Sequence, residues 1–185
     1  MIRFDNVSFS YGEKQIFKDL NLEIKKGDRI CLFAPSGYGK TTLLRLIMGL
    51  EKPDSGNIEG IRNKTFSVVF QEDRLIPQKK IYENIELFGG NDKITEILNN
   101  LNLSGTENLY PNELSGGMAR RVAIARAINY GGDIFILDEP FNGIDTENIK
   151  QTAEYILKIT ENKTIITVTH SKSEAELLKS EIIML

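Results

Sequence analysis

The chain has 185 residues, of which 41% are hydrophobic and 26% are charged, and its formal net charge is -3. These values are ordinary for a globular protein with one buried core, and the negative balance gives no reason to expect nucleic acid as a partner. The one cysteine, Cys31, lies in an apolar run, which predicts a core residue and excludes a disulfide within the chain. No apolar run approaches the roughly 18 residues of a membrane helix, so a role at a membrane would need a separate spanning chain.

Strand-like and helix-like apolar patterns alternate in the N-terminal part of the chain. Alternating apolar residues predict an edge strand in residues 1–11 and a second strand in residues 16–25. Continuous apolar runs predict strands buried on both faces in residues 28–34 and 66–70. Residues 40–50 have the apolar period of a helix.

The pattern changes to helices after residue 70 and returns to alternation later. In chain order, the predicted elements are helices in 81–87, 93–101 and 115–128, a strand in 133–139, a helix in 146–160, a strand in 164–170, a helix in 172–179 and a strand in 181–185. Because strands and helices alternate at both ends, we expect an α/β fold with a largely parallel sheet. The helices in the middle predict an inserted helical subdomain of about residues 72–128.

The stretch FAPSGYGKTT, residues 33–42, follows a predicted buried strand and opens a predicted helix, which is the context of a phosphate-binding loop. Such a loop offers backbone N–H groups and a helix N-terminus to phosphate oxygens. Lys40 would reach the β- and γ-phosphates, and the Thr41 hydroxyl would bind Mg²⁺. Ala34 stands where the pattern has its first glycine, which alanine can replace if φ is negative. The alternative is a strand–helix turn that merely contains Gly-Lys-Thr.

Two carboxylates, Asp138 and Glu139, end the apolar run IFILDE. Ligands of open α/β sheets bind at the carboxyl ends of the strands, where these side chains would lie. One acid can hold Mg²⁺ through water while the next polarises the attacking water. Alone, the pattern also fits a strand that runs into a surface loop, but a phosphate-binding loop upstream favours a nucleotide site.

The stretch LSGGMARR, residues 114–121, predicts a second anion site. Ser115 is a candidate helix N-cap, and the two glycines after it leave the backbone of the first turn uncovered. A single nucleotide does not need two such sites, and an ordinary capped helix is the alternative. The pair Arg120 and Arg121 is interpreted as a solvated helix face.

Taken together, these motifs resemble those of the ATP-binding subunits of ABC transporters. APSGYGKT is similar to the Walker A loop of that family, IFILDE to its Walker B strand and LSGGM to its signature LSGGQ. The resemblance implies a P-loop NTPase core with a mainly parallel central sheet, an N-terminal antiparallel β subdomain and the inserted α-helical subdomain. It also implies that residues 1–185 are a single ABC ATPase domain that binds ATP and Mg²⁺.

The resemblance carries roles to individual residues. It implies that Tyr11 stacks on adenine, that Gln71 meets Mg²⁺ and senses a membrane subunit, and that His170, the one histidine, is the switch histidine. From the residues alone, Tyr11 could also be a turn aromatic, and Gln71 and His170 could be polar groups at strand ends. The implied nucleotide contacts are Tyr11, Ser36, Gly37, Tyr38, Gly39, Lys40, Thr41, Thr42, Gln71, Ser115, Gly116, Gly117 and Asp145. The implied metal ligands are Thr41, Gln71 and Asp138, and the implied catalytic residues are Glu139, His170 and Lys40.

Three positions depart from the family pattern. Ala34 replaces the first glycine of Walker A, Met118 replaces the signature glutamine, and NGID, which ends at Asp145, replaces the commoner SALD. None of these changes removes a charge or a group that orients the nucleophile. An inactive site would be expected to lose Glu139 or His170 first, because binding survives without them. We therefore expect an active site that tolerates Ala34.

The resemblance implies an ATPase subunit that drives a membrane transporter, with the LSGG helix of a second subunit closing over the γ-phosphate. This arrangement predicts a head-to-tail homodimer, a separate permease chain and a cytoplasmic location at the inner face of the membrane. Residues 70–85 resemble those of importers for sulfonate, nitrate or taurine, which favours an importer of small solutes. The alternatives are a non-transport ABC ATPase, which usually has tandem cassettes or basic extensions, and a regulatory subunit that binds nucleotide without hydrolysing it.

Overall fold

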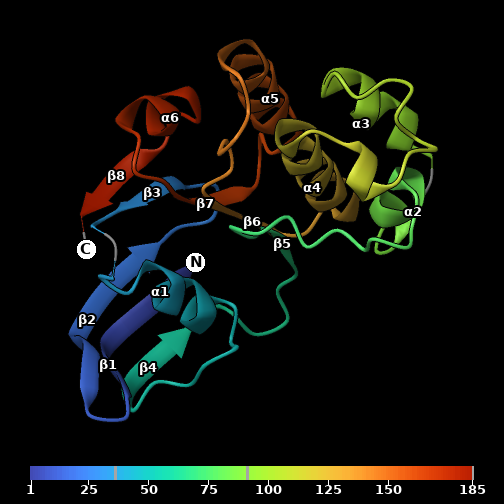
Figure 1. Ribbon diagram of the computed structural model, residues 1–185. Helices are drawn as coiled ribbons and strands as arrows, with labels where there is room; N and C mark the ends of the chain where they lie inside the picture. Colours follow the sequence, from blue (N-terminus) through green and yellow to red (C-terminus); the bar gives the residue numbers. More distant parts are fainter. Residues whose placement is uncertain (36, 91, 185) are drawn as a thin grey trace.

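The computed structural model describes residues 1–35, 37–90 and 92–184, and these residues form two β-sheets (Figure 1). The smaller sheet is antiparallel, as the resemblance implied, and has the order β2-β1-β4. Its strands are β1 (Ile2–Tyr11), β2 (Lys14–Ile24) and β4 (Ser55–Glu59). The prediction that β1 is an edge strand is wrong, because β1 lies between the other two. Side-chain alternation reports the two faces of a strand and carries no information about whether its edges are hydrogen bonded.

The larger sheet is parallel and has the order β5-β6-β7-β3-β8, which confirms the expected parallel sheet. Its strands are β5 (Phe66–Val69), β6 (Ile134–Asp138), β7 (Thr164–Val168), β3 (Arg29–Phe33) and β8 (Glu181–Met184). Every residue of β7 is buried, as expected for a strand with both faces covered. Because the strands are parallel, the carboxyl ends of β3, β6 and β7 meet at one edge of the sheet.

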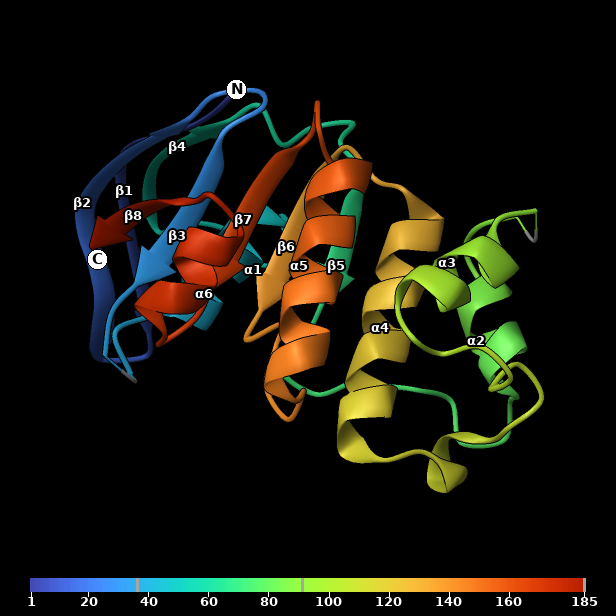
Figure 2. The ribbon, with the colours of Figure 1, turned by 90° about the horizontal axis from the view of Figure 1, so that it is seen from above.

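Helices cover both faces of the parallel sheet (Figures 1 and 2). Helix α1 (Lys40–Ile47) lies between the two sheets, and its buried leucines share one apolar cluster with β1 and β3. Helix α5 (Thr146–Ile159) packs on the opposite face, in a second cluster that contains Phe135 and Leu137 of β6. Helix α6 (Lys172–Leu177) lies between β7 and β8 in the chain. Because the leucines of α1 are buried, the predicted phosphate-binding loop leads into a helix that is anchored in the core.

A further group of helices extends beyond β5, at one edge of the parallel sheet (Figure 2). Three of them lie where helices were predicted: α2 (Ile81–Glu86), α3 (Ile94–Asn100) and α4 (Gly116–Tyr130). The short 3₁₀ helix η1 (Pro111–Glu113) was not predicted. Helix α4 packs against α2, α3 and β5, so it joins the group to the sheet. The limits of this group as a subdomain remain a prediction. Among the residues that the structure describes, no helix is both long and apolar enough to cross a membrane.

Candidate active site

A pocket of about 410 Å³ opens at the edge where the carboxyl ends of β3, β6 and β7 meet. This is the edge at which open α/β sheets bind ligands. The pocket brings together ten of the predicted site residues: Tyr11, Gly37, Gly39, Lys40, Thr41, Thr42, Gln71, Asp138, Glu139 and His170. They come from the ends of β1 and β6, the loop before α1, α1 itself, and the segments that follow β5, β6 and β7. Motifs that are far apart in the sequence thus form one site.

Some predicted residues lie outside this pocket. Tyr38 is 60% exposed and does not line it, and Ser36 lies outside the residues that the structure describes. Ser115, Gly116, Gly117 and Asp145 belong to other surfaces, at the N-termini of α4 and α5. The pocket also includes Lys14, Ile16 and Val168, which the sequence analysis missed. The pairing of Tyr11 with Lys14 across the β1–β2 hairpin was the available signal for Lys14, because a tight turn near Gly12 places the two strand ends together.

The loop before α1 has the backbone that a phosphate-binding loop requires. Gly37 and Gly39 have φ angles of +87° and +84°, in the left-handed region that favours glycine. Ala34 is not in that region and is buried, with 2% of its surface exposed, so this position does not need a glycine. The Lys40 ammonium donates to the backbone oxygens of Ala34 and Pro35 at 2.5 and 3.1 Å, which holds it over the loop. The expectation that the loop tolerates Ala34 agrees with this geometry.

Glu139 has an unusual backbone and an unusual carboxylate. Its φ angle is +48°, a strained value for a glutamate, and its peptide N–H donates to Val168 O at 2.8 Å. Nε2 of His170 lies 3.1 Å from Oε1 of Glu139. The two atoms are in contact but not aligned for a hydrogen bond, so the buried Oε1 has no hydrogen-bond partner in the described part of the chain. The Glu139 side chain as a whole is 19% exposed and lines the pocket, so its carboxylate can accept a proton from a water molecule there.

Burial raises the pKa of the Glu139 carboxyl, and the nearby His170 partly offsets this rise. Burial also raises the pKa of Asp138, against the opposing effects of Arg120, Lys40 and His170. Desolvation favours the neutral acid, whereas positive neighbours favour the carboxylate. A raised pKa makes Glu139 a stronger base than an exposed glutamate.

The side chains that could hold a metal are Thr41, Gln71 and Asp138, which all line the pocket. No cluster of three or more His, Cys, Asp or Glu side chains suited to a metal occurs within residues 1–35, 37–90 and 92–184. One hydroxyl, one amide and one carboxylate are too few for a closed protein site. They fit Mg²⁺, which usually keeps several waters and binds one or two carboxylates together with substrate phosphates.

Helix α4 begins with the predicted cap. Ser115 Oγ accepts a hydrogen bond from the Met118 N–H at 3.3 Å, which confirms Ser115 as the N-cap. At Gly117, a Cβ atom would lie 2.6 Å from Gly143 O, so the start of α4 packs directly on the segment after β6. Asp145 caps α5 by accepting hydrogen bonds from Asn148, which lower the pKa of the Asp145 carboxyl.

Comparison with known proteins identifies the family. Residues 17–142 match the profile of the family described as ABC transporter. The chain belongs to this family. It is 36% identical over 188 residues to an aliphatic sulfonates import ATP-binding protein of Rhodococcus jostii, with 97% of this chain and 76% of the relative covered. It is 37% identical to a probable sulfate/thiosulfate import ATP-binding protein of Chlorella vulgaris, with 100% of this chain and 86% of the relative covered.

The fold is that of a solved ABC transporter cassette. The dimeric structure of the bacterial cassette MJ0796 matches with a TM-score of 0.87 and 32% identity, over 100% of this chain and 94% of that chain. A structure of MJ0796 in a post-hydrolysis state bound to ADP and Pi matches with a TM-score of 0.86 and 31% identity. The mixed α/β architecture expected from the ABC motifs is therefore confirmed.

The arginines of the ABC signature helix overturn one expectation. Arg120 and Arg121 are 2% and 6% exposed, so their interpretation as a solvated helix face is wrong. Helix α4 is enclosed by the sheet edge and by the neighbouring helices, and both guanidinium groups end on backbone carbonyls instead of in water. Arg121 donates to Leu101 O and Asn102 O. Arg120 reaches the active site, on the other side of the helix.

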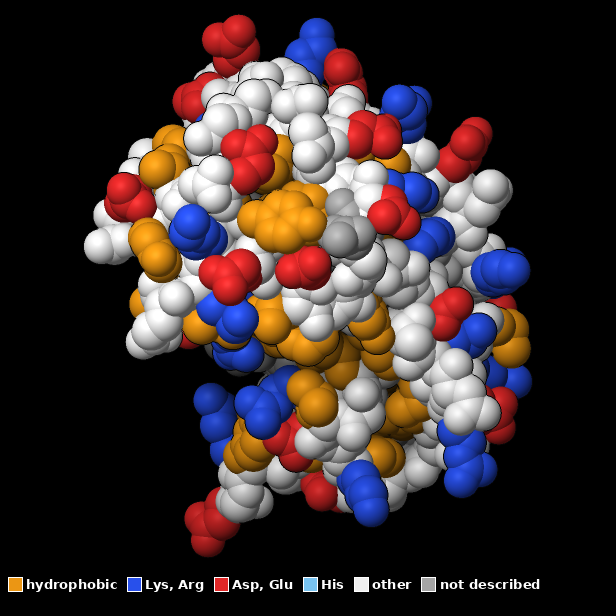
Figure 3. Space-filling view, turned by 90° about the vertical axis from the view of Figure 1, so that its right-hand side faces the viewer, with side chains coloured by type: hydrophobic (Ala, Val, Ile, Leu, Met, Phe, Trp, Pro, Cys, Tyr) orange, Lys and Arg blue, Asp and Glu red, His pale blue; other side chains and the backbone are white. Residues whose placement is uncertain are grey.

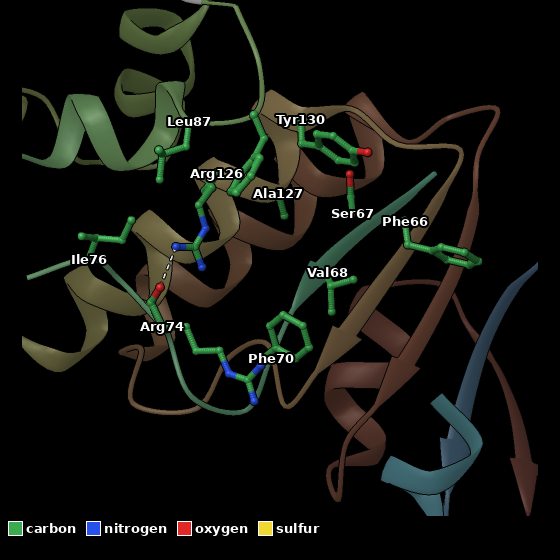
Figure 4. A pocket seen from close by; sticks show the side chains of 11 residues that line it. Phe66, Ser67, Val68, Phe70, Arg74, Ile76, Leu87, Arg126, Ala127 and Tyr130 are labelled. Atoms are coloured by element: carbon green, nitrogen blue, oxygen red, sulfur yellow. Dashed lines mark hydrogen bonds between the residues drawn. The ribbon is translucent and has the colours of Figure 1, made fainter. Parts of the chain in front are cut away.

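A second cavity of this ABC cassette, the apolar groove, lies between β5 and the ends of α2 and α4. It has a volume of about 470 Å³, and Figure 3 shows hydrophobic side chains gathered in a hollow on this face. Figure 4 shows Phe70 and Val68 on one side of the groove and Leu87 and Tyr130 on the other. The Arg74 guanidinium lies 4.1 Å from the centre of the Phe70 ring. Because Phe70 directly precedes a residue of the ATP pocket, the groove and the pocket share one segment of chain.

Proposed function

We propose that this chain is the ATP-binding and ATP-hydrolysing subunit of an ABC importer of small solutes. The observation that carries the proposal is the Glu139 carboxylate, which lines the pocket of the phosphate-binding loop with Oε1 3.1 Å from His170 Nε2. A subunit that only bound nucleotide would not need this pair. Similar proteins are named as import ATP-binding proteins for aliphatic sulfonates, sulfate or thiosulfate, and spermidine or putrescine.

In the proposed mechanism, the loop residues Ser36, Gly37, Tyr38, Gly39, Lys40, Thr41 and Thr42 bind the phosphates, and Tyr11 stacks on adenine. Glu139 takes a proton from the attacking water, and burial, which raises the pKa of its carboxyl, makes it a stronger base than an exposed glutamate. His170 holds Glu139 and the γ-phosphate in register, and Lys40 stabilises the negative charge that develops. Thr41, Gln71 and Asp138 would hold Mg²⁺, which supplies further charge neutralisation on the phosphates.

The second half of the site is proposed to come from another copy of the chain. Ser115, Gly116 and Gly117 lie at an exposed or half-exposed helix N-terminus outside the ATP pocket, which suits contact with a phosphate held by a neighbour. The structural relative MJ0796 is described as dimeric. We infer a head-to-tail homodimer with two ATP molecules at the interface, in which Asp145 also contacts the nucleotide across the interface. Each copy is a single ABC ATPase domain with a helical subdomain of about residues 72–128.

The membrane partner is proposed to be a separate permease chain that contacts the apolar groove from the cytoplasmic side. Support comes from the continuity of the groove with Gln71, which follows Phe70 directly and lines the ATP pocket. Phe88 and Tyr130 are 67% and 40% exposed at this groove, so an apolar segment of the permease would find uncovered rings there. A change at Gln71 during hydrolysis would be passed on to that segment.

The test is ATP hydrolysis by the purified chain over a protein concentration series with Mg²⁺. We expect the rate to rise faster than linearly with protein concentration, because two copies complete each site. Glu139→Gln should still bind ATP and should lower kcat by about 100- to 10,000-fold, the range for loss of a general base. Glu23→Gln makes the same chemical change on an exposed position of β2 and serves as the control.

The outcomes separate the candidate functions. If the wild-type chain binds ATP but never hydrolyses it, alone or as a dimer, the regulatory subunit that binds without turnover is the better reading. If Glu139→Gln hydrolyses ATP at the wild-type rate, the assignment of the base is wrong. Trapping of a stable dimer by Glu139→Gln and ATP would support the shared site.

A further inference from the structure

The buried guanidinium of Arg120 contacts both catalytic segments of the pocket at once. Its side chain is 2% exposed. Nε donates to Pro140 O at 3.1 Å, and Nη2 donates to Glu139 O at 2.6 Å and also to Asp138 O. Nη1 donates to the Phe70 carbonyl oxygen and to Asp73 Oδ1, the latter at 3.1 Å. Each of the three guanidinium nitrogens therefore donates to one of two segments, residues 70–73 or residues 138–140.

The two loops carry the groups that hydrolysis needs. One follows β5 and contains Gln71, and the other starts at the last residue of β6, Asp138, and continues with Glu139. Phe70 lies 50 residues before Arg120 in the chain, and Glu139 lies 19 residues after it. The two segments are therefore too far apart in the sequence to be joined by a hydrogen bond within one turn or helix. Arg120 provides a direct link between the segment with a proposed metal ligand and the segment with the proposed base.

Arg120 donates to the carbonyl of a residue with a strained backbone, Glu139. Glu139 has a φ angle of +48°, which a glutamate keeps only when its surroundings hold it. Its N–H is fixed by Val168 O at 2.8 Å, and its carbonyl is fixed by Arg120 at 2.6 Å. With the peptide held on both sides, the direction of the carboxylate depends on the position of the guanidinium.

Arg120 also belongs to the helix that begins at the signature. The N-cap Ser115 and the first helical residue Gly116 lie just over one turn before Arg120 in the continuous helix α4. A displacement of the N-terminus of α4 therefore moves Arg120 with it. In the proposed dimer, that N-terminus contacts the nucleotide of the other copy, so the displacement would report the state of the other site.

We infer that Arg120 is a positioning residue that couples the signature end of α4 to Gln71 and Glu139 of the same chain. The coupling to the second nucleotide rests on the proposed function. A lysine could keep the charge at this position but not the contacts, because an ammonium is a compact point charge, whereas the guanidinium is a planar fork with five donors. Arg120→Lys therefore separates positioning from charge.

The matched control is Arg121→Lys. Arg121 is the next residue of the same helix and is also buried, but it donates to Leu101 O, Asn102 O and Asn148 on the side away from the pocket. Both variants lose buried hydrogen bonds of a guanidinium, so both are expected to lower the melting temperature. Only Arg120→Lys changes the contacts of the two catalytic loops.

The first measurement is hydrogen exchange of the wild type and both variants, followed by peptide mass. We expect faster exchange in residues 70–73 and 138–142 for Arg120→Lys, with exchange there unchanged for Arg121→Lys. The second measurement is steady-state hydrolysis, where Arg120→Lys should lower kcat by about 10- to 100-fold, as loss of a group that orients a ligand does. The KM for ATP should change little, because the phosphate-binding loop is untouched, and the Hill coefficient should fall towards one.

Wild-type exchange in both loops, or an equal increase in both variants, would overturn the inference. Unchanged kcat and Hill coefficient in Arg120→Lys would do the same. If Arg120→Lys does not fold, Asp73→Asn removes the carboxylate that pairs with Arg120 and should change the same readouts in the same direction, more weakly. If the wild type itself fails to hydrolyse ATP, the proposed function fails, whereas the exchange measurement still decides whether Arg120 holds the two loops.

Discussion

The two glycines of the phosphate-binding loop allow backbone strain and steric contact to be separated. Gly37→Ala and Gly39→Ala both place a Cβ atom on a residue with φ near +85°, since the observed angles are +87° and +84°. At Gly37 the new atom would meet nothing within 4 Å. At Gly39 it would lie 2.6 Å from Cγ2 of Ile16 and 2.8 Å from Cζ of Phe17. The two variants therefore share the conformational cost and differ in the clash.

The expected losses follow from these contacts. An alanine in the left-handed region costs about 1–2 kcal/mol, so Gly37→Ala should lower the free energy of unfolding by that amount. At Gly39 the Cβ atom would also overpack the space beside Ile16 and Phe17, which costs about a further 1–3 kcal/mol. Gly39→Ala should thus lose about 2–5 kcal/mol in total, a large part of the about 5–15 kcal/mol that stabilises a typical domain.

The assay is urea denaturation without nucleotide, because bound ATP would stabilise the folded state by mass action. A third variant, Ile16→Ala, removes Cγ2 and should relieve part of the clash, so the double variant with Gly39→Ala should be more stable than the sum of the two single losses predicts. Equal losses for Gly37→Ala and Gly39→Ala, or strict additivity with Ile16→Ala, would refute the steric argument.

Three further predictions concern the core and the pH dependence of the site. Ala34→Gly removes a buried methyl group and gives the unfolded chain more conformational freedom, so it should lower the free energy of unfolding by about 1–2 kcal/mol. ATP affinity should not rise, and a gain in ATP affinity would contradict the conclusion that this position does not need a glycine. Burial raises the pKa of the Cys31 thiol to about 11, so iodoacetamide at neutral pH should label it only at the rate of unfolding, and fast labelling of the native protein would count against this. The negative charge of Glu174 adds to the effect of burial in raising the pKa of Glu139. Glu174→Gln removes this charge but can still accept the hydrogen bond of Thr169, so it should move the acid limb of the kcat/KM profile to lower pH, because a base with a lower pKa stays deprotonated at lower pH. A shift to higher pH would contradict the assignment of Glu139 as the base.

Much of the candidate site is visible in the sequence because each motif is local. The loop from Gly37 to Thr41 combines backbone amides and side chains within a few residues, and the Ser115 cap is a bond to Met118 only three residues on. Such features depend on spacing along one strand end or one helix turn, which sequence patterns record directly. The family resemblance then assigned these motifs to one nucleotide site, and ten of the predicted residues line one pocket.

Features that depend on distant partners are not recorded in this way. Apolar alternation predicted β1 but not its central place, and β4 escaped notice because Ile58 is its one apolar residue. A run of apolar residues also gives no order for the parallel strands, since any of them could pair with any other.

Arg120 is the clearest case of what only the tertiary structure decided. Two adjacent arginines on a helix suggest a solvated face, because an arginine is rarely buried without partners. The partners of Arg120 are carbonyl oxygens of residues such as Phe70, 50 positions away, and every residue type has such an oxygen. By itself, the sequence determined the local chemistry of the loop, the strand end and the helix cap. Which backbone oxygens surround a buried guanidinium was decided by the packing of α4 against the sheet, because no side-chain pattern encodes it.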